Sequence, residues 1–235
     1  MKLRTIVERA ARGRVLRRRL PNGVQIYVSP DAQLKYLKGE FDADLVELAD
    51  KWVAAGDTVW DIGSNCGVFA FSCDNAGRVL AVEADPFLAD MLRKSVEISD
   101  VPVVVLGCAL SDTCGVASFI IAQRGRASNH LSDVVGSSQS GGERSRLAVP
   151  TLTLDTLLEA EENCPALIKI DVEGAEVAVL AGGKKLFTEV QPVLWLETTK
   201  HSHETCKRFL EERGYVLERG AGENWLCLPP GRKRP

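Results

Sequence analysis

The sequence predicts an α/β fold, in which a largely parallel sheet is covered by helices on both faces. Strand-like and helix-like segments alternate along most of the chain, which is the pattern of parallel strands joined by crossover helices. The length of 235 residues suits a single domain, and a composition that is 45% hydrophobic and 26% charged excludes wholesale disorder and a fibrous repeat. No apolar run reaches the roughly 18 residues that a membrane-spanning helix requires.

The first elements follow from alternation, helical spacing and turn residues. Residues 23–28 alternate apolar and polar side chains after a Pro-Asn-Gly turn, which predicts a short strand. Apolar residues at helical spacing predict a helix over 44–53. A buried strand is expected at 58–62, where it leads into a glycine-rich turn, and a short helix is expected at 69–74.

The same pattern repeats in the middle of the chain. We expect a strand at 78–82, a helix over 86–98 that begins with a proline, and a third strand at 103–106. An additional strand at 116–122 stands outside the alternation. Residues 136–146 are rich in Gly and Ser and predict a flexible loop.

The last third of the chain completes the alternation. Three helices are expected, at 153–160, 175–181 and 204–213. Two strands lie between them, at 167–170 and 193–197. An antiparallel strand pair closes the chain, at 215–218 and 225–228.

Charge is distributed unevenly between the N-terminus and the rest of the chain. Residues 1–19 hold eight Lys and Arg side chains against one Glu, a net charge of +7, which leaves −10 for the remainder of a chain whose total is −3. We therefore expect a basic N-terminal arm with a short strand at 1–36, one domain at 37–228 and a basic tail at 229–235. The arm is either solvated or in weak contact with an anionic surface through residues 1–19.

The seven cysteines are scattered, form no C-x-x-C pair and are odd in number, so we expect reduced and mostly buried thiols. Arginines interrupt the N-terminal segment, which therefore lacks the apolar centre of a secretory signal. A cytoplasmic location is expected on these grounds.

A candidate cofactor site lies where the first two parallel strands end, because open α/β sheets bind ligands at the carboxyl ends of their strands. Asp61, Gly63 and Gly67 form the turn after the first strand, and Glu83 ends the next strand, where an acid can accept ribose hydroxyls. Asn65 stands where a dinucleotide motif has its second glycine, which disfavours a pyrophosphate. A carboxylate at this position suits a cationic ligand such as S-adenosylmethionine (SAM). The alternative is a two-glycine turn without a ligand.

A second group of acids follows the strand at 167–170. Asp171 comes directly after this strand, Glu173 and Glu176 share one face of the next helix turn, and Glu197 ends the following strand. Such a cluster could orient a substrate hydroxyl or amine and accept its proton. The alternative for Glu173 and Glu176 is that they face solvent near a helix N-terminus.

The histidines give a weaker signal. His201 and His203 have a spacing typical of metal ligands, but no third ligand is evident, so we expect a solvent-exposed segment and no metal site. His130 lies in the inserted region and is either a substrate contact or a solvated loop residue.

The motifs DIGSNCG at 61–67 and IKIDVEGAE at 168–176 resemble those of the FkbM family of SAM-dependent methyltransferases. The resemblance extends over residues 37–218, with further matches at 39–41, 56–59, 83–86, 109–112, 153–155 and 194–197. It implies a Rossmann-like class I methyltransferase fold with a seven-stranded sheet. It also implies methyl transfer from SAM, most often to a hydroxyl of a small molecule, a sugar or a polyketide-like product.

The resemblance also assigns residues. The methionine part of SAM would be lined by Asp61, Gly63, Asn65 and Gly67. Glu83 would bind the ribose, Ala84 would lie against the adenine, and Ala109 would border the adenine through its backbone. Asp171, Glu173 and Glu176 match the carboxylate motif, without separate roles. Two departures are a short helix after Gly67 and a long loop at 136–146, which is either a lid or disordered.

Two other functions remain open. A metal-assisted methyltransferase resembling catechol O-methyltransferase would use Asp171 as a ligand, but it would need an Asp-Asn pair where Glu197, Thr198 and Thr199 stand. The other is a binding module with a SAM-type fold, whose basic arm holds RNA or anionic lipid. We expect no nucleic-acid partner, because the body is acidic and lacks a basic patch interleaved with aromatic residues.

Overall fold

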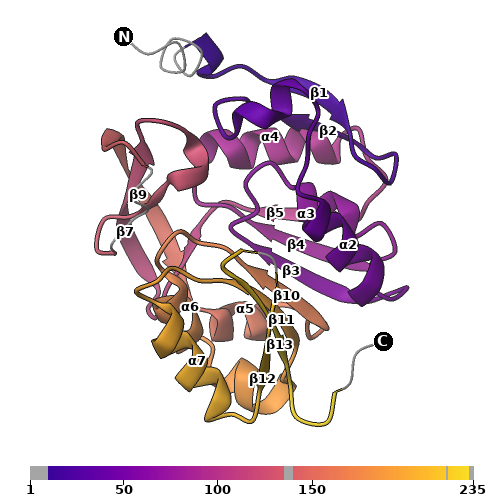
Figure 1. Cartoon of the computed structure of the whole chain (residues 1–235), viewed down its shortest axis with the longest axis vertical. Helices are drawn as coiled ribbons and strands as arrows, with labels where there is room; N and C mark the ends of the chain where they lie inside the picture. The colour runs from indigo at the N-terminus through magenta and orange to yellow at the C-terminus, as the bar shows by residue number, and fades with distance from the viewer. Residues whose placement is uncertain (1–9, 135–139, 221, 233–235) are drawn as a thin grey trace.

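A seven-stranded sheet with helices on both faces forms the centre of the computed structural model, which describes residues 10–134, 140–220 and 222–232 (Figure 1). The strand order is β12-β13-β11-β10-β3-β4-β5. The bounds are β3 Thr58–Ile62, β4 Arg78–Val82, β5 Val103–Leu106, β10 Leu167–Ile170, β11 Val193–Glu197, β12 Val216–Arg219 and β13 Asn224–Leu228. The pairs from β11 to β5 are parallel, and β13 runs antiparallel to β11 and β12. This arrangement confirms the predicted fold class.

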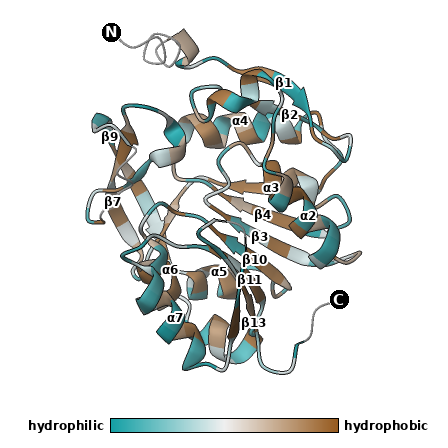
Figure 2. Ribbon diagram, in the orientation of Figure 1, coloured by the Kyte–Doolittle hydropathy of each residue, from teal (hydrophilic) through white to brown (hydrophobic). Residues whose placement is uncertain are grey.

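Side chains alternate between two cores because successive strand residues point to opposite faces. Val59 packs in the core that also holds α2, α3 and α4, whereas Trp60 packs in the core that holds α5, α6 and α7. The helix bounds are α2 Ala43–Trp52, α3 Val68–Ser72, α4 Pro86–Val96, α5 Leu154–Ala160, α6 Glu176–Ala181 and α7 His203–Glu211. Figure 2 shows the apolar strands between these two helical layers.

A second sheet is inserted between β5 and α5. Its order is β6-β9-β7-β8, with bounds β6 Ala109–Leu110, β7 Gly115–Ala122, β8 His130–Leu131 and β9 Glu143–Leu152. The expectation of a loop over 136–146 is wrong for residues 143–146, because β9 pairs antiparallel with β7 there. Residues 136–139 of the predicted loop, which was expected to be a lid or disordered, lie outside the described residues.

The N-terminal segment is folded where the structure describes it. β1 Leu16–Arg19 pairs antiparallel with β2 Gln25–Val28, so residues 16–19 of the expected basic arm form a strand that the sequence did not indicate. The hairpin is held because Ile26 and Val28 are fully buried in the main core, and the backbone N–H of Tyr27 donates to Ser95 Oγ of α4 at 2.8 Å. Residues 1–9 lie outside the described part of the chain.

Short helical turns complete the chain, at η1 Leu34–Leu37, η2 Arg126–Ser128 and the π-helical η3 Leu186–Val190. All seven cysteines are free, and five of them are buried, as the sequence predicted. Across the described residues, no helix is long and apolar enough to cross a membrane.

Candidate functional site

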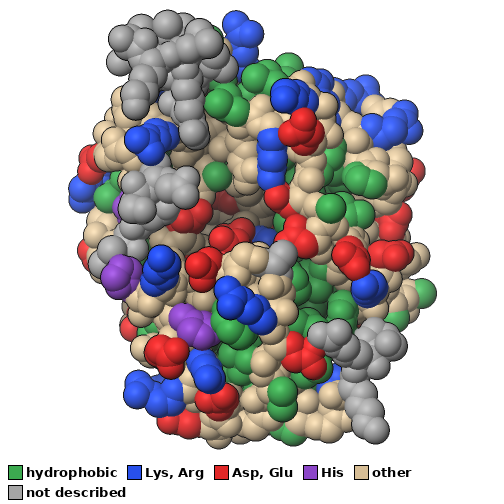
Figure 3. Space-filling view, viewed as in Figure 1, with side chains coloured by type: hydrophobic (Ala, Val, Ile, Leu, Met, Phe, Trp, Pro, Cys, Tyr) green, Lys and Arg blue, Asp and Glu red, His purple; other side chains and the backbone are tan. Residues whose placement is uncertain are grey.

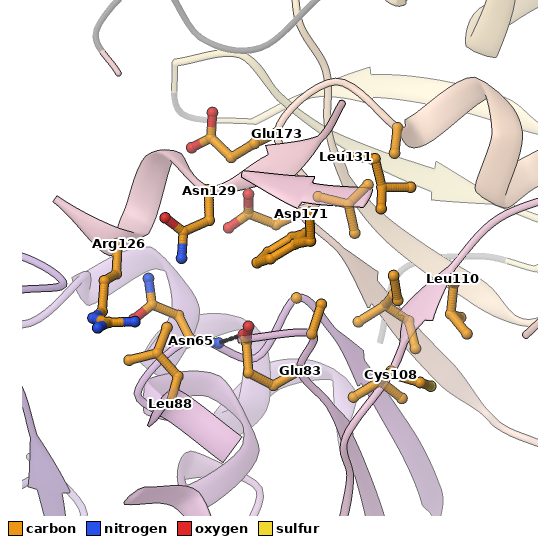
Figure 4. A pocket seen from close by; sticks show the side chains of 18 of the residues that line it. Asn65, Glu83, Leu88, Cys108, Leu110, Arg126, Asn129, Leu131, Asp171 and Glu173 are labelled. Atoms are coloured by element: carbon orange, nitrogen blue, oxygen red, sulfur yellow. Dashed lines mark hydrogen bonds between the residues drawn. The ribbon is translucent and has the colours of Figure 1, made fainter. Parts of the chain in front are cut away.

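A cavity opens at the carboxyl ends of β3, β4 and β10, under the inserted sheet (Figure 4). Its empty space is about 610 Å³ when the open mouth is included. Seven of the ten predicted site residues line it, namely Gly63, Asn65, Glu83, Ala84, Ala109, Asp171 and Glu173. The other three, Asp61, Gly67 and Glu176, lie outside its lining.

The turn after β3 is tightly packed against the end of β10. Gly63 has φ +77°, and a Cβ atom on it would lie 1.8 Å from the carbonyl oxygen of Asp171. Gly67, the N-cap of α3, has φ +81°, and its Cβ would lie 2.6 Å from Leu92. Both positions therefore require glycine. The helix that follows, α3, has only five residues, in line with the predicted short helix.

Asn65 contributes a buried acceptor to the cavity. It adopts φ +53°, a conformation that Asn tolerates better than most residues. Its amide oxygen Oδ1 is buried and has no hydrogen-bond partner among the described residues. A buried acceptor without a partner is costly unless a ligand or solvent donates to it, so Asn65 is available to a ligand.

Glu83 is held by the backbone on both sides. Its Oε2 accepts from the N–H of Asn65 and its Oε1 from the N–H of Asp85, each at 2.8 Å, and the residue is 7% exposed. Burial raises the pKa of Glu83 to about 8, although the two backbone hydrogen bonds favour the ionised form. Each carboxylate oxygen keeps a lone pair for a further donor, as a ribose-binding acid requires.

Asp61 lies beneath the cavity rather than in its wall. It is fully buried, and its Oδ1 is 3.2 Å from the ammonium Nζ of Lys169. Burial raises the pKa of Asp61 against the opposing attraction of Lys169. The cation that Asp61 contacts in this structure is therefore the side chain of Lys169.

The remaining carboxylates surround the end of β10. Asp171 and Glu173 lie across the cavity from Glu83 (Figure 4), and Figure 3 shows acidic side chains gathered around the hollow. Burial, then the charge of Asp171, raises the pKa of Glu173 to about 8. For Glu197, at the end of β11, the charge of Asp171 is the first cause and burial the second, and they raise its pKa to about 7.

Glu176 plays a more structural part. It is 2% exposed, so the alternative of a solvent-facing side chain is wrong for it. Its Oε1 accepts from the N–H of Gly174 at 2.7 Å and thereby holds the turn that leads into α6. Burial raises its pKa.

The inserted sheet supplies a wall that the sequence motifs did not indicate. Phe119 of β7, Arg126 of η2, Leu131 of β8 and Asn129 just before it line the cavity. His130 itself is not among the lining residues, and its Nδ1 lies 3.0 Å from the carbonyl oxygen of Ser128.

Arg126 connects this wall to two buried acids. It forms ion pairs with Asp31, at 2.9 Å, and with Asp85, the N-cap of α4. Asp31 also accepts two hydrogen bonds from Arg144 of β9, at 2.8 and 2.7 Å. Burial alone would raise the pKa of Asp31, but the hydrogen bonds from Arg144 and Arg126 lower it. No sequence signal links these residues, which come from distant parts of the chain.

Among the residues that the structure describes, there is no group of three or more His, Cys, Asp and Glu side chains placed to hold a metal ion. His203 stacks on the ring of Trp225, with ring centroids 4.4 Å apart, and its Nδ1 lies 3.4 Å from Thr198 Oγ1. His201 lies in an exposed turn before α7.

Comparisons with known proteins relate the chain to methyltransferases. Residues 61–217 match the family described as methyltransferase FkbM domain. Hexuronic acid methyltransferase AglP of Haloferax volcanii is 30% identical over 151 residues, which cover 64% of this chain and 59% of that protein. Ribosomal protein L11 methyltransferase of Clostridium perfringens is 29% identical over 108 residues, covering 43% of this chain and 34% of that protein.

Among solved structures, the methyltransferase FkbM from Methylobacillus flagellatus KT superposes with a TM-score of 0.48 and 16% identity. The superposition covers 73% of this chain and 43% of that chain. The chain thus spans less than two thirds of the length of each of these relatives.

Proposed function

The chain belongs to the FkbM family of methyltransferases, and from this membership we propose that it transfers a methyl group from SAM to a hydroxyl of a small molecule or sugar. The observation that carries the proposal is the convergence of two kinds of group in one cavity. Glu83 and the unpartnered amide oxygen of Asn65 stand on one side, and the carboxylates of Asp171 and Glu173 stand on the other.

The residues around the turn after β3 fit the cofactor. Glu83 accepts the ribose hydroxyls, and the free Oδ1 of Asn65 accepts from the ammonium of the methionine part. Ala84 and Ala109 leave room for the flat adenine ring. When bound, SAM supplies a methyl group on a cationic sulfonium, for which the acidic cavity is electrostatically suited.

The carboxylates after β10 and β11 serve the acceptor. Asp171 and Glu173 would orient the hydroxyl, and a carboxylate of the cluster would accept its proton as the oxygen–carbon bond forms and the bond between the methyl group and the sulfur breaks. Glu173 and Glu197 have pKa values of about 8 and about 7, which are near the optimum for a general base at neutral pH. Holding the two reactants in line supplies much of the rate.

Calorimetric titration with SAM and with S-adenosylhomocysteine (SAH) tests the cofactor part of the proposal. We expect both to bind the folded protein at one site. A folded sample that binds neither near neutral pH would refute the proposal.

Transfer of radiolabelled methyl groups tests the acceptor part. The relative from Haloferax volcanii is named for hexuronic acid, so the panel pairs each uronic acid with its neutral sugar and adds small alcohols and amines. Label in a hydroxyl-bearing acceptor is the expected result. Label only in amines would overturn O-methylation while leaving SAM dependence intact.

A further inference from the structure

Arg126 is a basic side chain in a cavity whose other charged side chains are acidic. Among the described residues that line the cavity, the charged ones are Glu83, Asp171, Glu173 and Arg126. Arg126 enters from η2 of the inserted sheet, and its side chain is 14% exposed. Either the fold or a ligand must explain this base among the acids.

The guanidinium of Arg126 is held in a fixed orientation. Its Nε donates to Asp31 at 2.9 Å and its Nη1 donates to Asp85. It also lies over the ring of Phe87, with its central carbon 4.4 Å from the ring centroid. Two of the three guanidinium nitrogens are therefore engaged, and the side chain is pre-organised before any ligand enters.

The third nitrogen, Nη2, is available to a ligand. It has no hydrogen-bond partner among the described residues, and it is not one of their buried polar atoms that lack a partner, so the protein does not enclose it. Arg144, by contrast, donates from both terminal nitrogens to the two oxygens of Asp31, at 2.8 and 2.7 Å, and is not among the lining residues. The two arginines share Asp31, but Arg126 also keeps a donor at the cavity.

An acceptor without a partner lies at the same end of the cavity. Figure 4 shows Arg126 and Asn65 at one end, and Cys108 and Leu110 at the other. Both Arg126 and Asn65 are hydrogen-bonded to the segment 83–85, and Oδ1 of Asn65 is buried without a partner among the described residues. An unused donor and an unused acceptor therefore belong to one end of the cavity.

This pair of groups matches the two charged groups of an α-amino acid. The N–H groups of a guanidinium suit a carboxylate, and the amide oxygen of Asn65 suits an ammonium. The acidic side chains elsewhere in the cavity disfavour an anion that carries no positive group of its own. The methionine part of SAM carries both groups on one carbon atom.

We propose that Arg126 binds a carboxylate of the ligand through Nη2 at this end of the cavity. This inference rests on the proposed use of SAM. Two molecules of the proposed reaction can present a carboxylate, namely SAM through its methionine part and a uronic acid acceptor. The methionine part is favoured, because its ammonium is placed to meet Asn65.

The first measurement compares SAM with decarboxylated SAM on the wild-type protein, by calorimetry at one fixed pH. Decarboxylated SAM keeps the adenosine, the sulfonium and the amine, and it lacks only the carboxylate. It has one more positive charge than SAM, so the acids of the cavity by themselves would favour it. We expect the wild type to bind SAM about tenfold more tightly instead.

Two matched variants, Arg126→Lys and Arg144→Lys, assign this preference to a residue. Each removes a guanidinium from Asp31 and keeps a positive charge, so the field at the titrating carboxyls of Glu83 and Glu173 is nearly preserved. The change at position 126 also removes N–H groups at the cavity. We expect the preference for SAM to fall about fivefold or more in Arg126→Lys and to keep its wild-type value in Arg144→Lys.

The acceptor as a source of the carboxylate is tested with D-glucuronate and D-glucose, each titrated into the complex with SAH. Here the preference for SAM would be the same in both lysine variants. Glucuronate would bind the wild type and bind Arg126→Lys about fivefold or more weakly, with glucose unaffected. That result would also support the inference and would assign the carboxylate to the acceptor.

The remaining outcomes overturn the inference. A folded Arg126→Lys that binds SAM with both comparisons unchanged would remove Arg126 from ligand binding and leave the proposed use of SAM intact. An equal fall in both lysine variants would assign the effect to the cluster around Asp31. An Arg126→Lys that does not fold, beside a folded Arg144→Lys, would make Arg126 a residue of the fold. A wild type that binds neither SAM nor SAH would refute the proposed function first, and the inference with it.

Discussion

The carbonyl oxygen of Asp171 occupies the space that a Cβ atom on Gly63 would need, at a separation of 1.8 Å. The turn after β3 and the end of β10 are therefore in direct backbone contact. A substitution that moves the backbone at the end of one strand also moves the end of the other. Gly63 should therefore tolerate no larger residue.

Gly63→Ala should destabilise the fold by about 3 kcal/mol or more, because the clash with backbone adds to the strain of a positive φ. Gly56→Ala is the matched control: its φ is +85° and a Cβ there would meet nothing within 4 Å, so only about 1 kcal/mol of strain is expected. Urea unfolding of both variants measures the difference. Equal losses of unfolding free energy in the two variants would contradict the close contact between Gly63 and the Asp171 carbonyl.

Glu83→Gln should weaken SAM binding by roughly 10-fold, because the amide replaces one of the two acceptor oxygens. The variant should also lose some stability, since its NH₂ group would face a backbone N–H. Calorimetry on the folded variant gives the affinity, with Glu189→Gln, an exposed glutamate, as control. Unchanged affinity would remove Glu83 from the cofactor site.

The protein without cofactor should be less stable at alkaline than at mildly acidic pH. The pKa values of Glu83 and Glu173 are about 8, above the value of about 4.3 expected in the unfolded chain. Between these values only the folded state holds the protons, so their contribution to stability declines as the pH rises through this window.

We expect the melting temperature to fall by roughly 10 °C or more from about pH 5.5 to about pH 8.5, because each of the two carboxyls loses about 3 kcal/mol of its contribution over this range. Differential scanning fluorimetry across this range measures it, and Glu83→Gln should show a smaller fall. A melting temperature that rises across the range would contradict the assignment of buried, protonated carboxyls.

Asp31→Asn should cost about 2–4 kcal/mol in the free energy of unfolding, because it weakens the partner of two nearly buried arginines, Arg126 and Arg144. SAM affinity should fall as well, since Arg126 lines the cavity. Glu143→Gln removes an exposed pair with Arg146 and should leave the urea midpoint unchanged. A similar midpoint for both variants would show that the Asp31 cluster adds no stability.

The central sheet could be predicted because each of its strands is recognisable from its own local sequence. Buried apolar segments such as β3 and β10 end in polar residues, and parallel neighbours bring those ends together. That is why Gly63, Glu83 and Asp171 meet in one cavity, as their positions in the sequence indicate.

Other parts of the site depend on long-range pairing. The first residues of β9 are polar and become a strand only because β7 pairs with them. The ion pair of Asp31 with Arg126 joins residues 95 positions apart, for which one sequence carries no signal. Lys169 is visible in the sequence as a charged residue inside an apolar strand. Its partners, however, are evident only in the three-dimensional structure.

The contacts that the N-terminal segment makes with the rest of the chain determine where a truncated form of this protein can begin. Beyond the ion pairs of Asp31, the backbone N–H of Arg126 donates to the Asp31 carbonyl at 2.8 Å, and Arg12 donates to the carbonyl of Gln123 at 3.1 Å. A fragment that starts at residue 61, where the family match begins, would lack Asp31 and the buried hairpin residues. We therefore expect that a fragment must begin at Arg12 or earlier to keep these contacts, and that residues 61–217 alone would lose them.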